Sequence, residues 1–99
     1  MAKYLLMWEV DKNKIAVGPK ERGTGWMALL DMTKQDIDKG IIKEWGAIVG
    51  EVNGYCVVEG NEIEIGSFVQ RYVPFVFFKA YPAASFNQVV EIVKNLIKA

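Results

Sequence analysis

The feature that most constrains the fold is residues 43–59, with the sequence KEWGAIVGEVNGYCVVE. Valine, isoleucine and aromatic residues dominate both halves of this stretch, which is typical of β-strands. The dipeptide Asn53-Gly54 between the halves favours a type I′ turn, because both residues readily adopt positive φ. The stretch therefore predicts a β-hairpin with Asn53 and Gly54 as its two loop residues.

A two-residue loop at this dipeptide would also fix which residues face each other. The expected cross-strand pairs are Val52 with Tyr55, Gly50 with Val57, Ile48 with Glu59 and, on the opposite side, Val49 with Val58. Both faces of the predicted hairpin are then apolar.

Length and composition predict a single domain spanning residues 1–99. Twelve basic and twelve acidic residues give a formal net charge of zero, so no overall field attracts nucleic acid or an anionic membrane. Cys56 is the only cysteine, which favours a reducing compartment and excludes a disulfide framework. The chain starts without a signal-peptide pattern, and no apolar run is long enough to cross a bilayer. We expect a soluble, cytoplasmic protein with no membrane or nucleic-acid partner.

The sequence contains no histidine. This absence excludes a histidine-ligated haem, a Ser-His or Cys-His nucleophile, the facial-triad iron site and the common catalytic zinc sites. We therefore expect no cofactor and no metal. Acid–base chemistry would depend on Asp, Glu, Lys, Tyr or Cys56.

Residues 3–10 form a nearly continuous apolar run, which predicts a central strand covered on both faces. Tyr4, Leu6 and Trp8 would share one side, with Leu5, Met7 and Glu9 on the other. Residues 11–25 are polar and contain several glycines, which predicts a long connection.

A first helix is predicted from Trp26 onwards and would end at Gly40. Its expected apolar face contains Trp26, Leu29, Leu30, Thr33 and Ile37, and the residues placed mostly off that face are Lys34, Gln35, Asp36 and Asp38.

Two capping boxes predict the other helices. Asn61 with Glu64 would start a second helix, closed by Pro74, and Ser85 with Gln88 would start a third helix that runs to the C-terminus. The second helix would present Ile65, Phe68, Val69 and Tyr72 as its apolar stripe. Between these helices, residues 75–81 predict a fourth strand that Pro82 would stop.

The resulting order predicts an α+β, ferredoxin-like βαββαβ fold with an extra C-terminal helix. Its four-stranded antiparallel sheet would have both crossover helices on one face. Because the strands are apolar on both sides, the other face needs a cover. The C-terminal helix would cover a little of it, and a homodimer with sheets face to face would cover more.

The residues resemble the dimeric α/β-barrel superfamily of ferredoxin-like proteins, in particular a group of small, uncharacterised bacterial and archaeal domains of unknown function. The resemblance rests on KYLLMWEV at the start, on Gly40-Ile41-Ile42 followed by Trp45, on the strand from Tyr55 to Glu59, and on FFKAYP near the end. It implies a dimer but no activity, since the superfamily includes monooxygenases, muconolactone-type isomerases, haem-degrading enzymes and regulatory domains. Its haem-binding members use histidine, which this chain lacks.

The predicted ligand site is the interior between sheet and helices, or the dimer interface. The candidate residues are Trp8, Glu9, Trp26, Trp45, Tyr55, Arg71, Tyr72 and Lys79. For the aromatic residues the alternative is simple packing. For Glu9 and Lys79, which interrupt apolar strands, the alternative is a salt bridge within or between subunits. Cys56 is expected to be a small buried hydrophobe.

RNA binding through an RRM-like strand is also disfavoured. Residues 53–60 have the glycine and the first aromatic of that signature, but they lack its basic residue, and Val57 and Gly60 occupy positions that need stacking aromatics.

Three functional hypotheses remain. The first is a homodimer that binds a small apolar or aromatic molecule. The second is a cofactor-independent enzyme of monooxygenase or isomerase type, using Glu9, Tyr55, Arg71 or Lys79. The third is a regulatory or structural interaction module.

Overall fold

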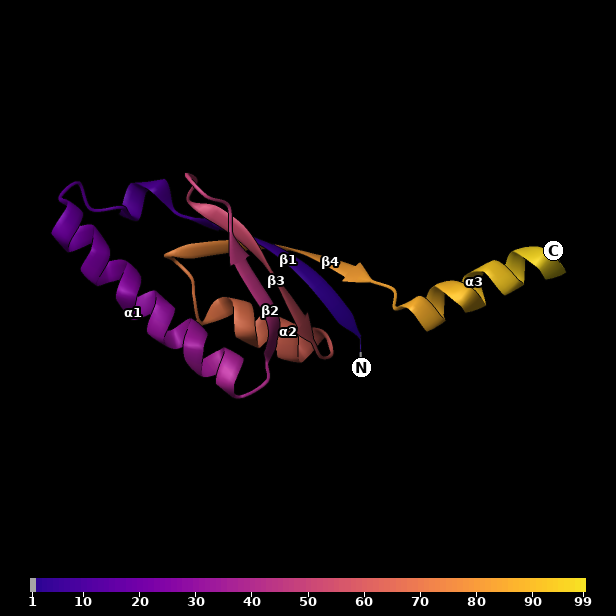
Figure 1. Cartoon of the computed structure of the whole chain (residues 1–99). Helices are drawn as coiled ribbons and strands as arrows, with labels where there is room; N and C mark the ends of the chain where they lie inside the picture. Colours follow the sequence, from indigo (N-terminus) through magenta and orange to yellow (C-terminus); the bar gives the residue numbers. More distant parts are fainter. Residues whose placement is uncertain (1) are drawn as a thin grey trace.

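The computed structural model describes residues 2–99 and has an α+β architecture (Figure 1). Its elements in chain order are β1 (Lys3–Val10), the short 3₁₀ helix η1 (Lys12–Lys14), α1 (Pro19–Asp38), β2 (Ile42–Ala47), β3 (Asn53–Glu59), α2 (Glu62–Gln70), β4 (Val76–Ala83) and α3 (Phe86–Lys98). The four strands form one open antiparallel sheet in the order β2-β3-β1-β4.

The strand order interleaves the two strand–helix–strand units. β3 lies between β1 and β2, and β1 lies between β3 and β4. An inserted antiparallel strand in each unit is compatible with the predicted ferredoxin-like arrangement. The predicted α+β class and four-stranded antiparallel sheet are confirmed.

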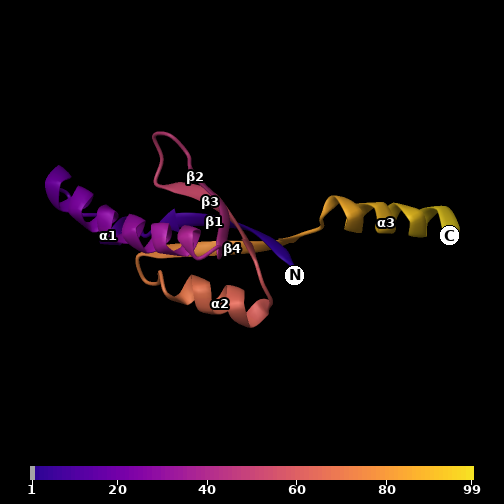
Figure 2. The same cartoon turned by 60° about the horizontal axis from the view of Figure 1, so that its bottom comes forward.

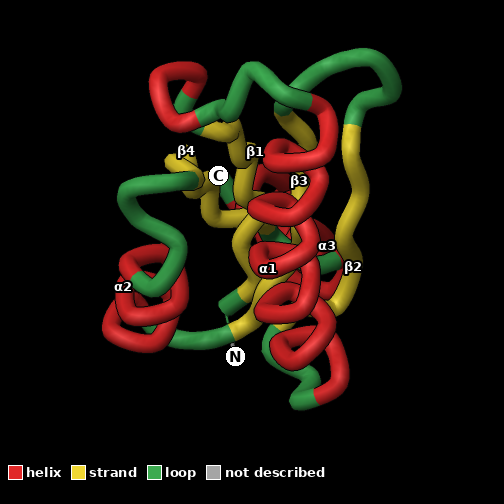
Figure 3. The backbone as a smooth tube through the Cα atoms, turned by 90° about the vertical axis from the view of Figure 1, so that its left-hand side faces the viewer, coloured by secondary structure: helices red, strands yellow, loops and turns green. Residues whose placement is uncertain are grey.

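Helices α1 and α2 pack against the same face of the sheet (Figures 2 and 3). The buried core combines residues of the strands, of α2 and of the turn after α2: Leu6, Ile42, Cys56, Val58, Ile65, Phe68, Tyr72 and Val76. Leu29 and Met32 of α1 pack against this cluster. As predicted, Leu6 and Trp8 share the helix-facing side of β1, and Leu5, Met7 and Glu9 lie on the open side.

The predicted hairpin exists, but its two-residue loop at Asn53-Gly54 was wrong. Both residues belong to β3, and residues 48–52 form the loop, in which Gly50 has a φ of 85°. The loop is closed by a hydrogen bond from the Ile48 amide to the Asn53 carbonyl at 2.9 Å. The register is consequently shifted, and Tyr55 faces Gly46 instead of Val52.

Gly54 is required for close packing and not for a turn. A Cβ atom built on Gly54 would lie 2.2 Å from the Gly46 carbonyl oxygen and 2.5 Å from the Trp8 ring. Gly46 is required for the same reason on the open face, because a Cβ atom there would lie 2.5 Å from the Tyr55 ring. Glycine in a strand often marks such a close approach.

Helix α1 begins seven residues before the predicted start at Trp26. Pro19 occupies its first turn, where a missing amide hydrogen costs nothing. The predicted connection over residues 11–25 is therefore wrong in its second half, because residues 19–25 are helical. Gly40, with a φ of 78°, follows the end of the helix as predicted.

Strand β4 continues through Pro82 to Ala83, so the predicted stop at Pro82 was also wrong. Pro82 lies opposite Tyr4, and β4 pairs with β1 alone. An edge strand tolerates proline because one of its sides has no partner strand.

Both predicted capping boxes are present. The Asn61 side chain accepts from the Glu64 amide at 2.9 Å, and the Ser85 side chain accepts from the Gln88 amide at 3.2 Å. These bonds satisfy amide groups that have no partner within the helix.

Helix α3 does not cover the open face of its own sheet, contrary to the prediction. It extends away from the other elements (Figure 1), and none of its residues is buried. The radius of gyration is 16.5 Å, against about 13 Å expected for a compact chain of this length. The open face of the sheet is therefore uncovered within residues 2–99.

Candidate functional site

An apolar pocket of about 240 Å³ lies between α1, the sheet and the turn after α2. It contains four of the predicted site residues, Trp8, Trp26, Trp45 and Tyr72. The remaining lining is largely aliphatic or aromatic, and includes Leu29, Leu30, Ile42, Phe68, Val76 and Phe78. The pocket lies between sheet and helices, the region for which the sequence predicts a ligand site.

Trp8 and Trp45 form one wall of the pocket. Their rings are stacked, with centroids 5.4 Å apart and an interplanar angle of 8°. The Trp8 indole Nε1 donates to the backbone carbonyl of Tyr55 at 3.2 Å, which fixes the ring over Gly54. The stacked pair gives this wall a flat aromatic surface, which suits contact with a planar molecule.

Trp26 lies on α1, on the other side of the pocket. The Arg22 guanidinium lies over its ring at 5.8 Å from the centroid. Arg22 also donates to the carbonyls of Ala16 and Val17, at 3.4 and 3.0 Å. One side chain therefore joins the segment before α1 to the Trp26 ring.

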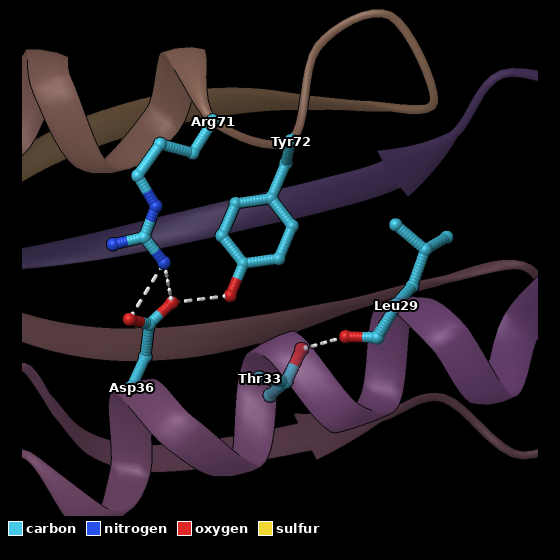
Figure 4. A network of polar contacts seen from close by, with 5 residues as sticks. All are labelled: Leu29, Thr33, Asp36, Arg71 and Tyr72. Atoms are coloured by element: carbon cyan, nitrogen blue, oxygen red, sulfur yellow. Dashed lines mark hydrogen bonds and ion pairs between the residues drawn. The ribbon is translucent and has the colours of Figure 1, made fainter.

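A polar network lies at the end of the pocket formed by Tyr72 (Figure 4). Asp36 of α1 is 0 % exposed, and its carboxylate accepts from Arg71 Nη2 at 2.7 and 2.5 Å. The Tyr72 hydroxyl donates to the same carboxylate at 2.5 Å. The network joins α1 to the turn after α2, and its paired charges cancel.

Burial and this network shift several pKa values. Burial is the main cause that raises the pKa of Tyr72, and the hydrogen bond to Asp36 raises it further. The hydrogen bond with Asp36 raises the pKa of Arg71. Burial raises the pKa of Cys56 to about 12. Tyr72 and Cys56 are therefore neutral at physiological pH, and Cys56 is a buried hydrophobe as predicted.

Asp36 was missed, since the sequence placed it off the apolar face of α1. The buried and half-buried residues of that face are Arg22, Trp26, Leu29, Met32, Thr33 and Asp36. Leu30 and Ile37, which were expected on the face, are exposed. The helical spacing from Leu29 through Thr33 to Asp36 could have indicated that Asp36 faces the core. Aspartate is rarely buried without a paired charge, however, and the sequence did not identify that partner.

Three predicted site residues lie elsewhere. Glu9, Tyr55 and Lys79 are on the open face of the sheet, where Glu9 and Lys79 line a wide hollow of about 920 Å³. No ion pair joins Glu9 to Lys79 among residues 2–99. Arg71 follows α2 on the side of the sheet that the helices cover, and its guanidinium is paired with Asp36. The four residues proposed for an enzyme therefore do not meet within one chain.

Over the same range, residues 2–99, no group of three or more His, Cys, Asp or Glu side chains is placed to hold a metal ion. The described helices also include none with the length and apolarity needed to span a bilayer.

Comparison with known proteins gives no relative: no family model, no curated protein and no solved structure matches this chain.

Proposed function

We propose that this chain is a cytoplasmic homodimer of ferredoxin-like protomers, of the dimeric α/β-barrel kind, that binds a small apolar or aromatic molecule in the pocket between α1 and the sheet. The strand order and the residues that resemble this superfamily support the first part. The buried single thiol of Cys56 suits a reducing compartment.

The observation that carries the ligand proposal is the pocket itself. Its volume of about 240 Å³ exceeds the roughly 150 Å³ of an apolar cavity that binds benzene, so one or two fused rings would fit. Flat indole rings and aliphatic side chains surround this space, and such a lining is typical of small-molecule sites. Among the described residues that line the pocket, Glu51 alone carries a charge, so the ligand is not expected to be an anion.

The homodimer is supported by the open sheet face. Leu5, Met7, Phe77 and Tyr81 lie on two neighbouring strands of this face and are 37–49 % exposed. Contiguous apolar patches of this kind mark interaction sites, and a second copy is the partner that needs no other molecule. Glu9 and Lys79 lie on the same face, where each is available for an ion pair across the twofold axis.

Intrinsic fluorescence tests the ligand proposal directly. All three tryptophans of the chain, Trp8, Trp26 and Trp45, line the pocket, so the whole tryptophan signal reports on it. Titration with toluene, naphthalene and p-cresol should give a saturable change in emission, with calorimetry as an independent measure. A linear, non-saturating response to every compound would refute the proposal.

A matched pair of variants locates the binding. Leu30 and Met27 are both exposed apolar residues of α1, but only Leu30 lines the pocket. Leu30→Glu introduces a charge at the pocket and should weaken binding at least tenfold. Met27→Glu introduces the same charge on the same helix and should leave binding unchanged.

A further inference from the structure

Helix α3 has one continuous apolar face, and none of its residues is buried within its own chain. Its apolar residues are Phe86, Val89, Val90, Ile92, Val93, Leu96 and Ile97, and its polar residues are Asn87, Gln88, Glu91, Lys94, Asn95 and Lys98. At 100° per residue the two sets occupy separate arcs of the helix. Phe86, Leu96 and Ile97 are 82, 70 and 79 % exposed.

A helix of this length needs a partner to be stable. α3 has 13 residues, and isolated helices shorter than about 12–15 residues are marginal in water. Its capping box contributes on the order of 1 kcal/mol, which does not replace tertiary packing. A stable α3 therefore also requires burial of its apolar face.

The path of the chain directs α3 away from its own sheet. β4 stays paired with β1 as far as Ala83, opposite Lys3, and only Ala84 and Ser85 precede the helix. Ser85 is extended, with φ −72° and ψ 168°. The helix consequently continues past the C-terminal end of β4, beyond the ends of the strands (Figures 1 and 2).

The open sheet face is the matching uncovered surface of the same chain. A 13-residue helix is about 20 Å long, and an eight-residue strand spans about 26 Å, so the helix fits along the strands. A helix about 10 Å wide covers roughly two strands, which is the width of the apolar patch on β1 and β4.

We infer that in the homodimer each α3 packs on the open sheet face of the other protomer, as an exchanged arm. The inference rests on the proposed homodimer and differs from direct sheet-to-sheet contact, because over β1 and β4 the covering element of the partner would be α3. A twofold exchange buries both apolar surfaces of both chains at once. The two arms would bury on the order of 1,000 Å² or more in total, enough for a specific interface.

Two glutamate substitutions on opposite sides of α3 test the arm. Val93→Glu places a charge in the apolar face, whereas Asn95→Glu places it in the polar face. Sedimentation equilibrium should give a dimer for the wild type and for Asn95→Glu, and at least a tenfold weaker dimer for Val93→Glu. A Val93→Glu dimer as tight as the wild type would refute the arm but leave the homodimer intact. A monomeric wild type would refute both, whereas ligand binding is measured separately by tryptophan fluorescence.

Cross-linking identifies the surface under the arm. Leu96→Cys on α3 and Phe77→Cys on the open face are made in separate chains, mixed, and treated with a short bis-maleimide. Cys56 is 1 % exposed, and the unsubstituted chain measures its background. The expected product is a covalent dimer that forms in the mixture and in neither variant alone. Dimers of Leu96→Cys alone would indicate helix–helix pairing, and a double variant that links only within its own chain would indicate that α3 folds back. Either result would overturn the inference.

Discussion

The two faces of the sheet carry similar side chains in opposite surroundings. Leu6, Cys56 and Val58 on the helix-facing side are at most 1 % exposed, whereas Leu5 and Met7 on the other side are 37 and 41 % exposed. Leu5 and Leu6 are neighbours of the same residue type. Hydrophobicity therefore specifies that both faces need a cover, but the connections of the chain decide which face receives one from its own helices.

The largest difference in stability between the two faces is expected when the two adjacent leucines are truncated. Leu6→Ala should lower the free energy of unfolding by about 4 kcal/mol, because it leaves a cavity in the core. Leu5→Ala should cost less than about 1 kcal/mol in dilute protein, since its side chain is partly solvated. Denaturant titration of both variants measures the difference. Equal costs at every protein concentration would mean that the open face is covered within one chain.

The polar network offers a second comparison, between two aspartates of α1. Asp36→Ala should cost about 3 kcal/mol, because the buried Tyr72 hydroxyl and the Arg71 guanidinium lose their common partner. Asp38→Ala removes only an exposed ion pair with Lys34 at 3.1 Å and should cost roughly 0.5 kcal/mol or less. Thermal and denaturant unfolding provide the measurement, and similar losses for both variants would contradict the buried network.

Alkaline pH should lower the free energy of unfolding through two buried groups on the helix-facing side, Cys56 and Tyr72. The Cys56 pKa is raised from 9.0 to about 12, so the thiol loses its proton at a lower pH in the unfolded chain than in the folded one. The contribution of Cys56 is complete below about pH 9 and is lost as pH rises through about 12. Tyr72, whose pKa is also raised, acts in the same direction above its ordinary value. Unfolding titrations across this range should show falling stability, and Cys56→Ala should flatten the early part of the fall.

The smallest effect is expected for the charges of the open face. Glu9→Gln and Lys79→Met each remove a charge that has no ion-pair partner among residues 2–99. Each should change the monomer's unfolding free energy by about 0.5 kcal/mol or less. Their effect should appear instead in the dimer dissociation constant, measured by sedimentation. Loss of monomer stability by more than about 1 kcal/mol would show that these charges act within one chain.

The parts of the fold that were predicted correctly depend on local chemistry. The capping boxes at Asn61 and Ser85 formed because their donors and acceptors are three residues apart. The alternation along β1 was also readable, because side chains of a strand point to opposite faces.

The incorrect predictions involve residues whose role depends on distant partners. Gly54 looked like a turn residue, but the Trp8 ring, far away in sequence, is the reason for the glycine. Asp36 looked like a solvated carboxylate because its partners, Arg71 and Tyr72, lie more than thirty residues away. Four aromatic pocket residues could be predicted by type, and Leu29 and Thr33 were expected on the apolar face of α1. Which strand residues line the same pocket required the fold.

The hydrogen bond from Trp8 to the Tyr55 carbonyl connects the two faces. Trp8 lines the pocket, and the Tyr55 ring lies across Gly46 on the open face. The backbone carbonyl that holds the Trp8 ring thus belongs to the residue whose side chain lies on the open face. If the proposed ligand and the proposed homodimer both exist, ligand binding and self-association would be linked equilibria, and each would alter the constant of the other by the same factor.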